Sequence, residues 1–243
     1  MMKNIEELEN KIKEIGTSMG ATYVGFSNIS SAHDEICNQG GEYLRQYSYC
    51  VTIGMVLPDS TIDGIMRGDL HSFPDYLSAY QIINQQLGMI SMMIATFIQQ
   101  NGYLSMAFSP TLYPDKEKLC SNLSHKIGAS LSGLGWIGKS GLLITPDNGP
   151  RVRFVSVLTD LQLRNSSAPL NPRCGNCHAC VDACPVHAYT GREFIVGEPR
   201  EMRFNAVACY DLHRQLENEG KINMCGYCVQ ACPYGKQAKN IIK

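Results

Sequence analysis

The sequence predicts an α+β protein of two domains, a larger one over residues 1–164 and a smaller one over residues 165–243. In the first part, segments with helical spacing of apolar residues alternate with segments of strand-like alternation. The second part holds eight of the eleven cysteines. Between them, residues 165–172 are rich in Asn, Ser and Pro, a composition typical of a linker. We therefore place the domain boundary there.

The elements expected in the first domain follow from where its apolar residues recur. Helices are predicted over about residues 5–15, 75–100 and 122–131, and strands over about 21–26, 51–57 and 103–108. Residues 142–145 and 153–159 are predicted to pair as two strands joined by the turn at 146–150. Met89, Met92 and Met93 on the long helix are expected to fill the core, because methionine packs irregular gaps. Together these elements predict an antiparallel or mixed sheet with helices packed on it.

The cysteines of the second domain form two runs with distinctive spacing. Residues 174–184 read C-x2-C-x2-C-x3-C and residues 225–232 read C-x2-C-x3-C, each followed by proline. A C-x2-C-x2-C loop wraps three thiolates around one cubane cluster, and the fourth must come from elsewhere in the chain. In two-cluster ferredoxins the cysteine before proline binds the other cluster. The spacing therefore predicts a ferredoxin-like domain with two [4Fe–4S] clusters that carry single electrons.

The same rule divides the thiols between the clusters. The ligands expected for the first cluster are Cys174, Cys177, Cys180 and Cys232. Those expected for the second are Cys184, Cys225, Cys228 and Cys209, the last being the only further cysteine between the two runs. Cys37, Cys50 and Cys120 are scattered through the first half and are expected to be ordinary thiols. Zinc is the alternative, but it favours separate C-x2-C pairs or Cys/His sets.

Composition and charge narrow the class of protein further. The net charge is −1 and no Lys/Arg stripe marks a surface for nucleic acid. The first residues lack the basic and apolar regions of a signal peptide, so disulfide bonds are not expected. The most apolar run, residues 89–98, is far shorter than the roughly 20 residues of a membrane span. We expect a cytoplasmic protein that binds no membrane.

A glycine-rich loop precedes the linker. Residues 133–141 read GLGWIGKSG and contain the only tryptophan of the chain. The interval from Gly133 to Gly138, Lys139 and Ser140 also matches a phosphate-binding loop. That motif follows a strand and opens a helix, whereas here a predicted helix precedes the loop and a strand follows. We therefore do not expect a nucleotide site.

Taken together, these motifs resemble the epoxyqueuosine reductase family, which comprises cobalamin- and double [4Fe–4S]-dependent proteins related to reductive dehalogenases. The resemblance rests on GLGWIGK, LLITP, VSVLTDL, the first cysteine run and the tail with ACY followed by MCGYCVQACP. It covers about residues 48–238, and its lone-cysteine order supports Cys209 as a ligand. It implies a nitroreductase-like α/β sandwich that holds a base-off corrinoid (cobalamin) against the first cluster, whose electrons reduce the cobalt.

On this resemblance the glycine-rich loop approaches the corrinoid. The residues implied are Gly133, Gly135, Trp136, Gly138, Lys139 and Ser140. The alternative is that the loop only packs the two domains together.

Three departures from the family bear on the substrate. No aspartate stands at the position of the family's proton donor, which leaves Tyr113, Asp115 and His125 as weak candidates for a catalytic acid. We also expect the helical-repeat extension that grips tRNA to be missing, and no basic surface is expected. We therefore predict a short, divergent member that reduces a small molecule rather than tRNA and takes electrons from an external low-potential donor. The alternative is an electron-transfer protein that reduces a corrinoid or metal centre on a partner protein.

Overall fold

The computed structural model describes residues 4–65, 72–111, 117 and 119–236. The chain divides into two compact units, each built from segments that are separate in sequence. The first comprises Met1–Val56, Ile83–Leu134 and Arg153–Leu170; the second comprises Leu57–Ile82, Gly135–Val152 and Asn171–Lys243. The mixed α and β architecture is confirmed. Two segments of the second unit, Leu57–Ile82 and Gly135–Val152, fall within the predicted first domain, residues 1–164. The predicted division into residues 1–164 and 165–243 stays a prediction.

A four-stranded sheet forms the centre of the first unit, in the order β1-β2-β6-β3. Its strands are β1 (Tyr23–Asn28), β2 (Tyr49–Val56), β3 (Ser105–Ala107) and β6 (Val152–Thr159). β1 pairs antiparallel with β2, and β3 pairs antiparallel with β6. Most residues of β2 and β6 are buried irrespective of the face to which they point. Such burial requires packing on both sides of the sheet.

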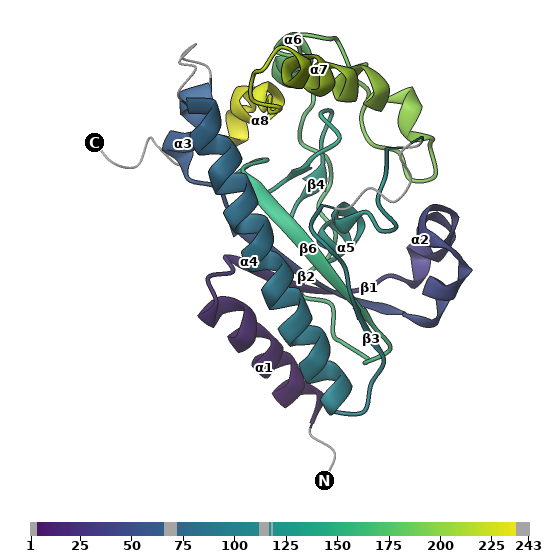
Figure 1. Ribbon diagram of the computed structural model, residues 1–243. Helices are drawn as coiled ribbons and strands as arrows, with labels where there is room; N and C mark the ends of the chain where they lie inside the picture. The colour runs from purple at the N-terminus through teal and green to yellow at the C-terminus, as the bar shows by residue number, and fades with distance from the viewer. Residues whose placement is uncertain (1–3, 66–71, 112–116, 118, 237–243) are drawn as a thin grey trace. The chain divides into compact units, whose positions relative to one another are not determined.

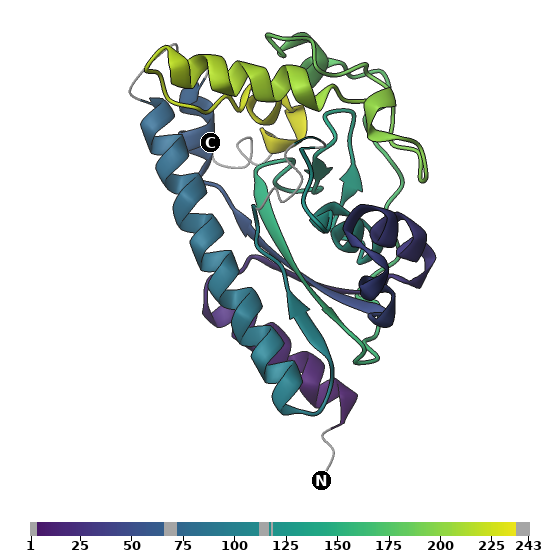
Figure 2. The same ribbon diagram turned by 45° about the vertical axis from the view of Figure 1, so that its right-hand side comes forward.

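Helices supply that packing. The helices of this unit are α1 (Ile5–Ser18), α2 (His33–Gly40), α5 (His125–Leu131) and the later part of α4 (Ser72–Gln100). α1 and α4 lie on one face of the sheet, and α5 and α2 lie on the other (Figures 1 and 2). Two short 3-10 helices, Ser30–Ala32 and Glu42–Gln46, flank α2. The predicted helix near the N-terminus is confirmed: the Asn4 side chain caps it, and Leu8 and Ile12 are buried.

Two expectations about the first half of the chain are wrong. The strand over residues 142–145 does not pair with the strand over residues 153–159: β5 (Leu143–Ile144) pairs with β4 (Trp136–Ile137) in a separate two-stranded sheet, whereas β6 belongs to the four-stranded sheet. Secondly, Met89, Met92 and Met93 do not fill the core, because each is about half exposed or more. The buried face of α4 instead carries Leu87, Ile90, Ile94 and Ile98.

The second unit consists of short elements and loops. These are α3 (Asp59–Gly64), the first part of α4, the β4–β5 hairpin, α6 (Ala179–Asp182), α7 (Ala206–Asn218) and α8 (Tyr227–Ala231), with 3-10 turns at Arg200–Met202 and Pro233–Gly235. α6 and α8 contact each other, which brings the two cysteine runs together. Among the described residues, no helix combines the length and the apolar character that crossing a membrane requires.

Candidate metal centre

Four thiols of the second unit line one pocket. They are Cys174, Cys177, Cys180 and Cys232, the set that the cysteine spacing assigns to the first cluster. Lys139, Ser140, Ile144, Pro233 and Tyr234 complete the lining. The pocket therefore gathers cysteines from both runs.

Local backbone geometry explains how the chain reaches this arrangement. Gly175 has a φ of +50°, which lets the loop turn tightly after Cys174, and the Cys177 amide donates to the Cys174 carbonyl at 2.9 Å. Cys232 ends α8 in an extended conformation, and Pro233 begins the following 3-10 turn. Proline cannot continue the helix, so the chain bends at the fourth thiol.

The thiols of this set influence one another electrostatically. Burial, together with the charges of Cys232, Cys174 and Cys177, raises the pKa of Cys180 to about 11, and burial contributes most. Thiolates gathered in this way repel each other unless a cationic centre neutralises them. A metal centre bound by thiolates would supply that neutralisation.

A second set of thiols surrounds an apolar cluster. Cys184, Ala188 and Tyr189 are buried together, and Cys209 and Cys228 pack against them. Burial raises the pKa of Cys209 to about 11, with further contributions from Cys225 and Cys184. Burial likewise raises the pKa of Cys228 to about 12, with contributions from Cys225, Cys209 and Cys180.

The second set is thus Cys184, Cys209, Cys225 and Cys228. Cys209 comes from α7 and Cys228 from α8, and the Ala188 amide donates to Cys184 Sγ at 3.3 Å. The electrostatic influence of Cys180 on Cys228 links the two sets. All eleven cysteines are free thiols.

The donor set fits iron–sulfur clusters. A single zinc ion would draw its ligands to about 2.3 Å from one point. Among the described residues, no three His, Cys, Asp or Glu side chains are grouped to hold a single ion. The first set instead surrounds a pocket, and four soft thiolates around a small space are what a cubane cluster requires.

The glycine-rich loop forms the β4–β5 hairpin beside the first set. A Cβ at Gly138 would lie 2.7 Å from Ile144 Cγ1 and 3.3 Å from Cys174 Sγ. Lys139 reaches the first cysteine run and donates from Nζ to the Gly175 carbonyl at 2.6 Å. A hairpin, rather than a helix, thus follows the glycines, and the context of a phosphate-binding loop is absent from this described segment.

Trp136 is buried inside the second unit. Its ring meets Tyr234 edge-on with centroids 4.8 Å apart, and the Arg173 guanidinium lies 5.6 Å from its centroid. Tyr234 also donates from its hydroxyl to the Arg173 carbonyl at 3.0 Å. The indole Nε1 has no hydrogen-bond partner among the described residues.

Close packing within each unit explains why positions 135 and 133 of the loop are occupied by glycine. A Cβ at Gly135 would lie 2.3 Å from the Ile144 carbonyl oxygen. Gly133 has a φ of +74°, and a Cβ there would lie 2.5 Å from Ser167 Cβ. Because the protein itself leaves no room, substituting either glycine would disturb the fold whether or not a ligand binds. A corrinoid contact for these glycines stays a prediction.

Of the three candidate acids, only His125 lies among the described residues; Tyr113 and Asp115 lie outside them. His125 Nε2 is 3.0 Å from the Ser109 carbonyl, which can only accept, so Nε2 carries the proton. Nδ1 is 3.1 Å from Ser156 Oγ and accepts from it. Burial lowers the pKa of His125 to about 4, and the charges of Arg153 and Lys126 contribute. A neutral imidazole with both nitrogens engaged is a poor proton donor at neutral pH.

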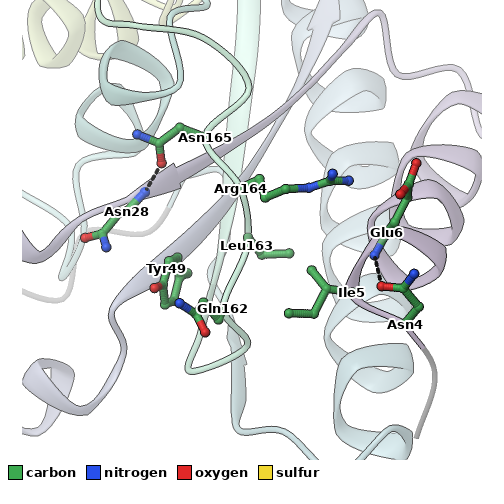
Figure 3. Close-up of a pocket in the computed structure, with 9 residues that line it drawn as sticks. All are labelled: Asn4, Ile5, Glu6, Asn28, Tyr49, Gln162, Leu163, Arg164 and Asn165. Atoms are coloured by element: carbon green, nitrogen blue, oxygen red, sulfur yellow. Dashed lines mark hydrogen bonds between the residues drawn. The ribbon is translucent and has the colours of Figure 1, made fainter.

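A second pocket lies in the first unit (Figure 3). It is lined by Asn4, Ile5, Glu6, Asn28, Tyr49, Gln162, Leu163, Arg164 and Asn165. Several polar groups of this pocket already have partners within the unit. The backbone N–H of Asn28 donates to Asn165 Oδ1 at 2.7 Å, and the Arg164 guanidinium forms an ion pair with Glu9 at 2.6 Å. No cysteine or histidine lines it.

Sequence reasoning missed one residue of the cluster sites and one contact of a residue that it had named. It assigned Lys139 to the cofactor without foreseeing its bond to the cysteine loop. It also overlooked Tyr189, which is buried among the second thiol set and stacks on Phe204 at 5.2 Å. The one signal for Tyr189 was its place five residues after Cys184.

Comparisons with known proteins agree with this geometry. The family described as "4Fe-4S double cluster binding domain" matches residues 173–235, which include all eight cysteines of the two sets. The second unit therefore contains a double [4Fe–4S]-binding domain. The resemblance to epoxyqueuosine reductases is also confirmed, by curated relatives and by solved structures.

Among the curated relatives, the epoxyqueuosine reductase of Synechococcus sp. (strain RCC307) is 34% identical over 114 residues, which are 47% of this chain and 35% of the relative. That of Atelocyanobacterium thalassa (isolate ALOHA) is 34% identical over 119 residues, 47% of this chain and 38% of the relative. The matched part thus spans little more than a third of these relatives.

Solved structures show the same fold over nearly the whole chain. An epoxyqueuosine reductase from Bacillus subtilis gives a TM-score of 0.62 at 17% identity, covering 97% of this chain and 67% of that one. A reductive dehalogenase gives a TM-score of 0.67 at 19% identity, covering 100% of this chain and 35% of that one.

Proposed function

We propose that this protein is an oxidoreductase that passes single electrons through two [4Fe–4S] clusters to a bound corrinoid, at which a small substrate is reduced. The observation that carries the proposal is the grouping of eight thiols into two sets of four. Each set draws on both cysteine runs, and the second set also includes Cys209. Cys174, Cys177, Cys180 and Cys232 hold the first cluster. Cys184, Cys209, Cys225 and Cys228 hold the second.

Each set performs a distinct task in this proposal. The first binds its cluster in a pocket that also contains a buried ammonium and a hydroxyl, those of Lys139 and Ser140. The second excludes water from its cluster through Ala188, Tyr189 and Phe204. The α6–α8 contact keeps the sets close, which electron transfer between them requires. The clusters supply one-electron redox chemistry when bound.

The corrinoid part rests on the relatives and on one unsatisfied donor. The reductive dehalogenase with the same fold is described as suggesting a mechanism for B12-dependent dehalogenation. A corrinoid bears amide carbonyls at its rim, and the Trp136 indole N–H is a buried donor that lacks a partner among the described residues. We assign corrinoid contact to the loop from Gly133 to Ser140, and a nitroreductase-like sandwich to residues 1–164.

The substrate proposed is a small molecule rather than tRNA. One epoxyqueuosine reductase of the same fold has been solved with an epoxyqueuosine-modified tRNA-Tyr stem loop. This chain has a net charge of −1, and binding a polyanion depends on neutralising its phosphates. An external low-potential donor supplies the electrons.

The test is an anaerobic spectral titration of the iron-loaded protein with cobalamin. We expect a saturable shift to the base-off spectrum. A full iron content with no shift would overturn the corrinoid part of the proposal.

The hydrogen bonds of His125 favour a second candidate function, that of an electron-transfer protein without its own substrate, because they leave this residue unable to serve as the catalytic acid. Both ring nitrogens of this acid are occupied by Ser109 and Ser156. The protein would then reduce a corrinoid or metal centre on a partner. Binding to a corrinoid-loaded protein, with no affinity for free cobalamin, would select this function.

A further inference from the structure

Lys139 occupies an unusual place for a lysine. Its side chain is 7% exposed, and its Nζ donates at 2.6 Å to the carbonyl of Gly175, between Cys174 and Cys177. The same side chain lines the pocket of the first thiol set. Burial of an ammonium is strongly unfavourable unless an anion lies near it.

The pocket itself identifies that anion. Its lining contains four thiols and no carboxylate. Elsewhere in the second unit, a buried cation has conventional partners, since Arg151 pairs with Asp59 and Asp63. Four thiolates around a cluster carry net negative charge, so the occupied site is the natural counter-ion for Lys139.

We propose that Lys139 raises the reduction potential of the first cluster above that of the second; the proposal rests on the cluster assignment made above. Reduction makes a cluster more negative by one charge. A fixed positive charge in the same pocket stabilises the reduced form more than the oxidised form, and low polarity strengthens the effect.

The second thiol set lies beside an apolar cluster. In the described part of the chain, Cys184 packs in this cluster with Ala188, Tyr189, Val181, Val186 and Phe204, together with Cys209 and Cys228 of the set. The hydroxyl of Tyr189 is hydrogen-bonded to Cys228, but it is neutral. Apolar surroundings disfavour an added negative charge, which lowers the potential of the second cluster. An electron that enters the pair therefore comes to rest on the first cluster.

The key variant is Lys139→Gln, which removes the charge while its amide can still donate toward the Gly175 carbonyl. Lys139→Arg keeps the charge. Lys221→Gln makes the same chemical change at an exposed lysine of the same unit, paired with Glu219 at 2.6 Å. The readout is an anaerobic redox titration followed by electron paramagnetic resonance, on iron-loaded protein without cobalamin.

We expect Lys139→Gln to lower the midpoint potential of one cluster by about 59 mV. For one electron, this shift changes the ratio of reduced to oxidised cluster at a fixed potential by roughly tenfold. The midpoint that moves should belong to the cluster that survives in Cys209→Ser. Lys139→Arg and Lys221→Gln should keep both midpoints. Unchanged midpoints in Lys139→Gln at full iron content, or movement of the other midpoint, would overturn the proposal.

Iron content separates a potential-setting role from a purely structural one. If Lys139→Gln does not load, Lys139→Met serves the same comparison. Failure of both to load, with Lys139→Arg loaded, would overturn the proposal, because the residue would then be needed to retain the cluster. A wild-type chain with fewer than about eight irons would instead overturn the proposed function. Absence of cobalamin binding would leave this inference untouched.

Discussion

The guanidinium of Arg151 donates from Nη1 to the Asp59 carboxylate at 2.7 Å while its side chain is wholly buried. Nη2 donates to Asp63 at 2.8 Å. Gly235 lies against the same side chain, since a Cβ there would be 2.5 Å from Arg151 Nε. Arg151 thus joins α3 to the segment that follows Cys232.

Arg151→Met should strongly destabilise the protein. It leaves two partly buried carboxylates without their cation, and breaking a buried ion pair in this way costs about 3–5 kcal/mol. The measurement is urea unfolding of the iron-loaded protein. The matched control is Arg45→Met, because Arg45 also bridges two carboxylates, Asp34 and Glu42, but on the surface. Exposed pairs contribute little. Equal effects of the two variants would contradict the role given to Arg151.

Cys209→Ser should remove about half of the iron or make the second cluster labile, since a cubane needs four ligands. Cys120→Ser is the control, because that cysteine belongs to neither thiol set and should leave the iron content unchanged. Iron analysis and electron paramagnetic resonance under anaerobic conditions check both variants. A full iron content with two normal signals in Cys209→Ser would refute the ligand assignment.

Gly138→Ala should weaken the first cluster. The added methyl group would crowd Ile144 and Cys174, and overpacking costs about 1–3 kcal/mol. We expect iron release to a chelator to accelerate by roughly tenfold, since about 1.4 kcal/mol corresponds to a factor of ten. Gly141→Ala is the control: its Cβ would meet nothing within 4 Å, although its φ of +67° strains the backbone. Equal release rates for the two variants would count against contact between the hairpin and the first site.

Residue spacing predicts those parts of this protein whose geometry is local. The period of apolar residues locates α1 and α4, and the cysteine spacing anticipates the four thiols that line the first pocket. Pairing of short strands is not local. β4 and β5 meet because Gly135 lets the backbone approach Ile144 closely, and nothing in the alternation of residues 142–145 indicates that partner.

Buried charges are equally hidden from sequence reasoning. Arginine and lysine are usually exposed, so the sequence gives no reason to expect a buried Arg151, and it assigns Lys139 to cofactor contact without indicating that it is buried. Their burial depends on partners from distant segments: Asp59 and Asp63 for Arg151, the first cysteine run for Lys139. Exposure of Met89 could not be foreseen either, because apolar spacing does not say how wide the buried face of α4 is.

Stability should fall on mild acidification because of His125. Its pKa is lowered to about 4 in the folded protein, against about 6.5 in the unfolded chain. Between these values the unfolded chain binds more protons, so the free energy of unfolding decreases as the pH falls from 6.5 toward 4. From pH 7 to pH 5 the wild type should lose about 2 kcal/mol more than His125→Asn. Urea unfolding at both pH values measures this, with iron content as the control at each. Parallel losses in the two proteins would show that His125 is not held neutral by its burial and its bonds to Ser109 and Ser156.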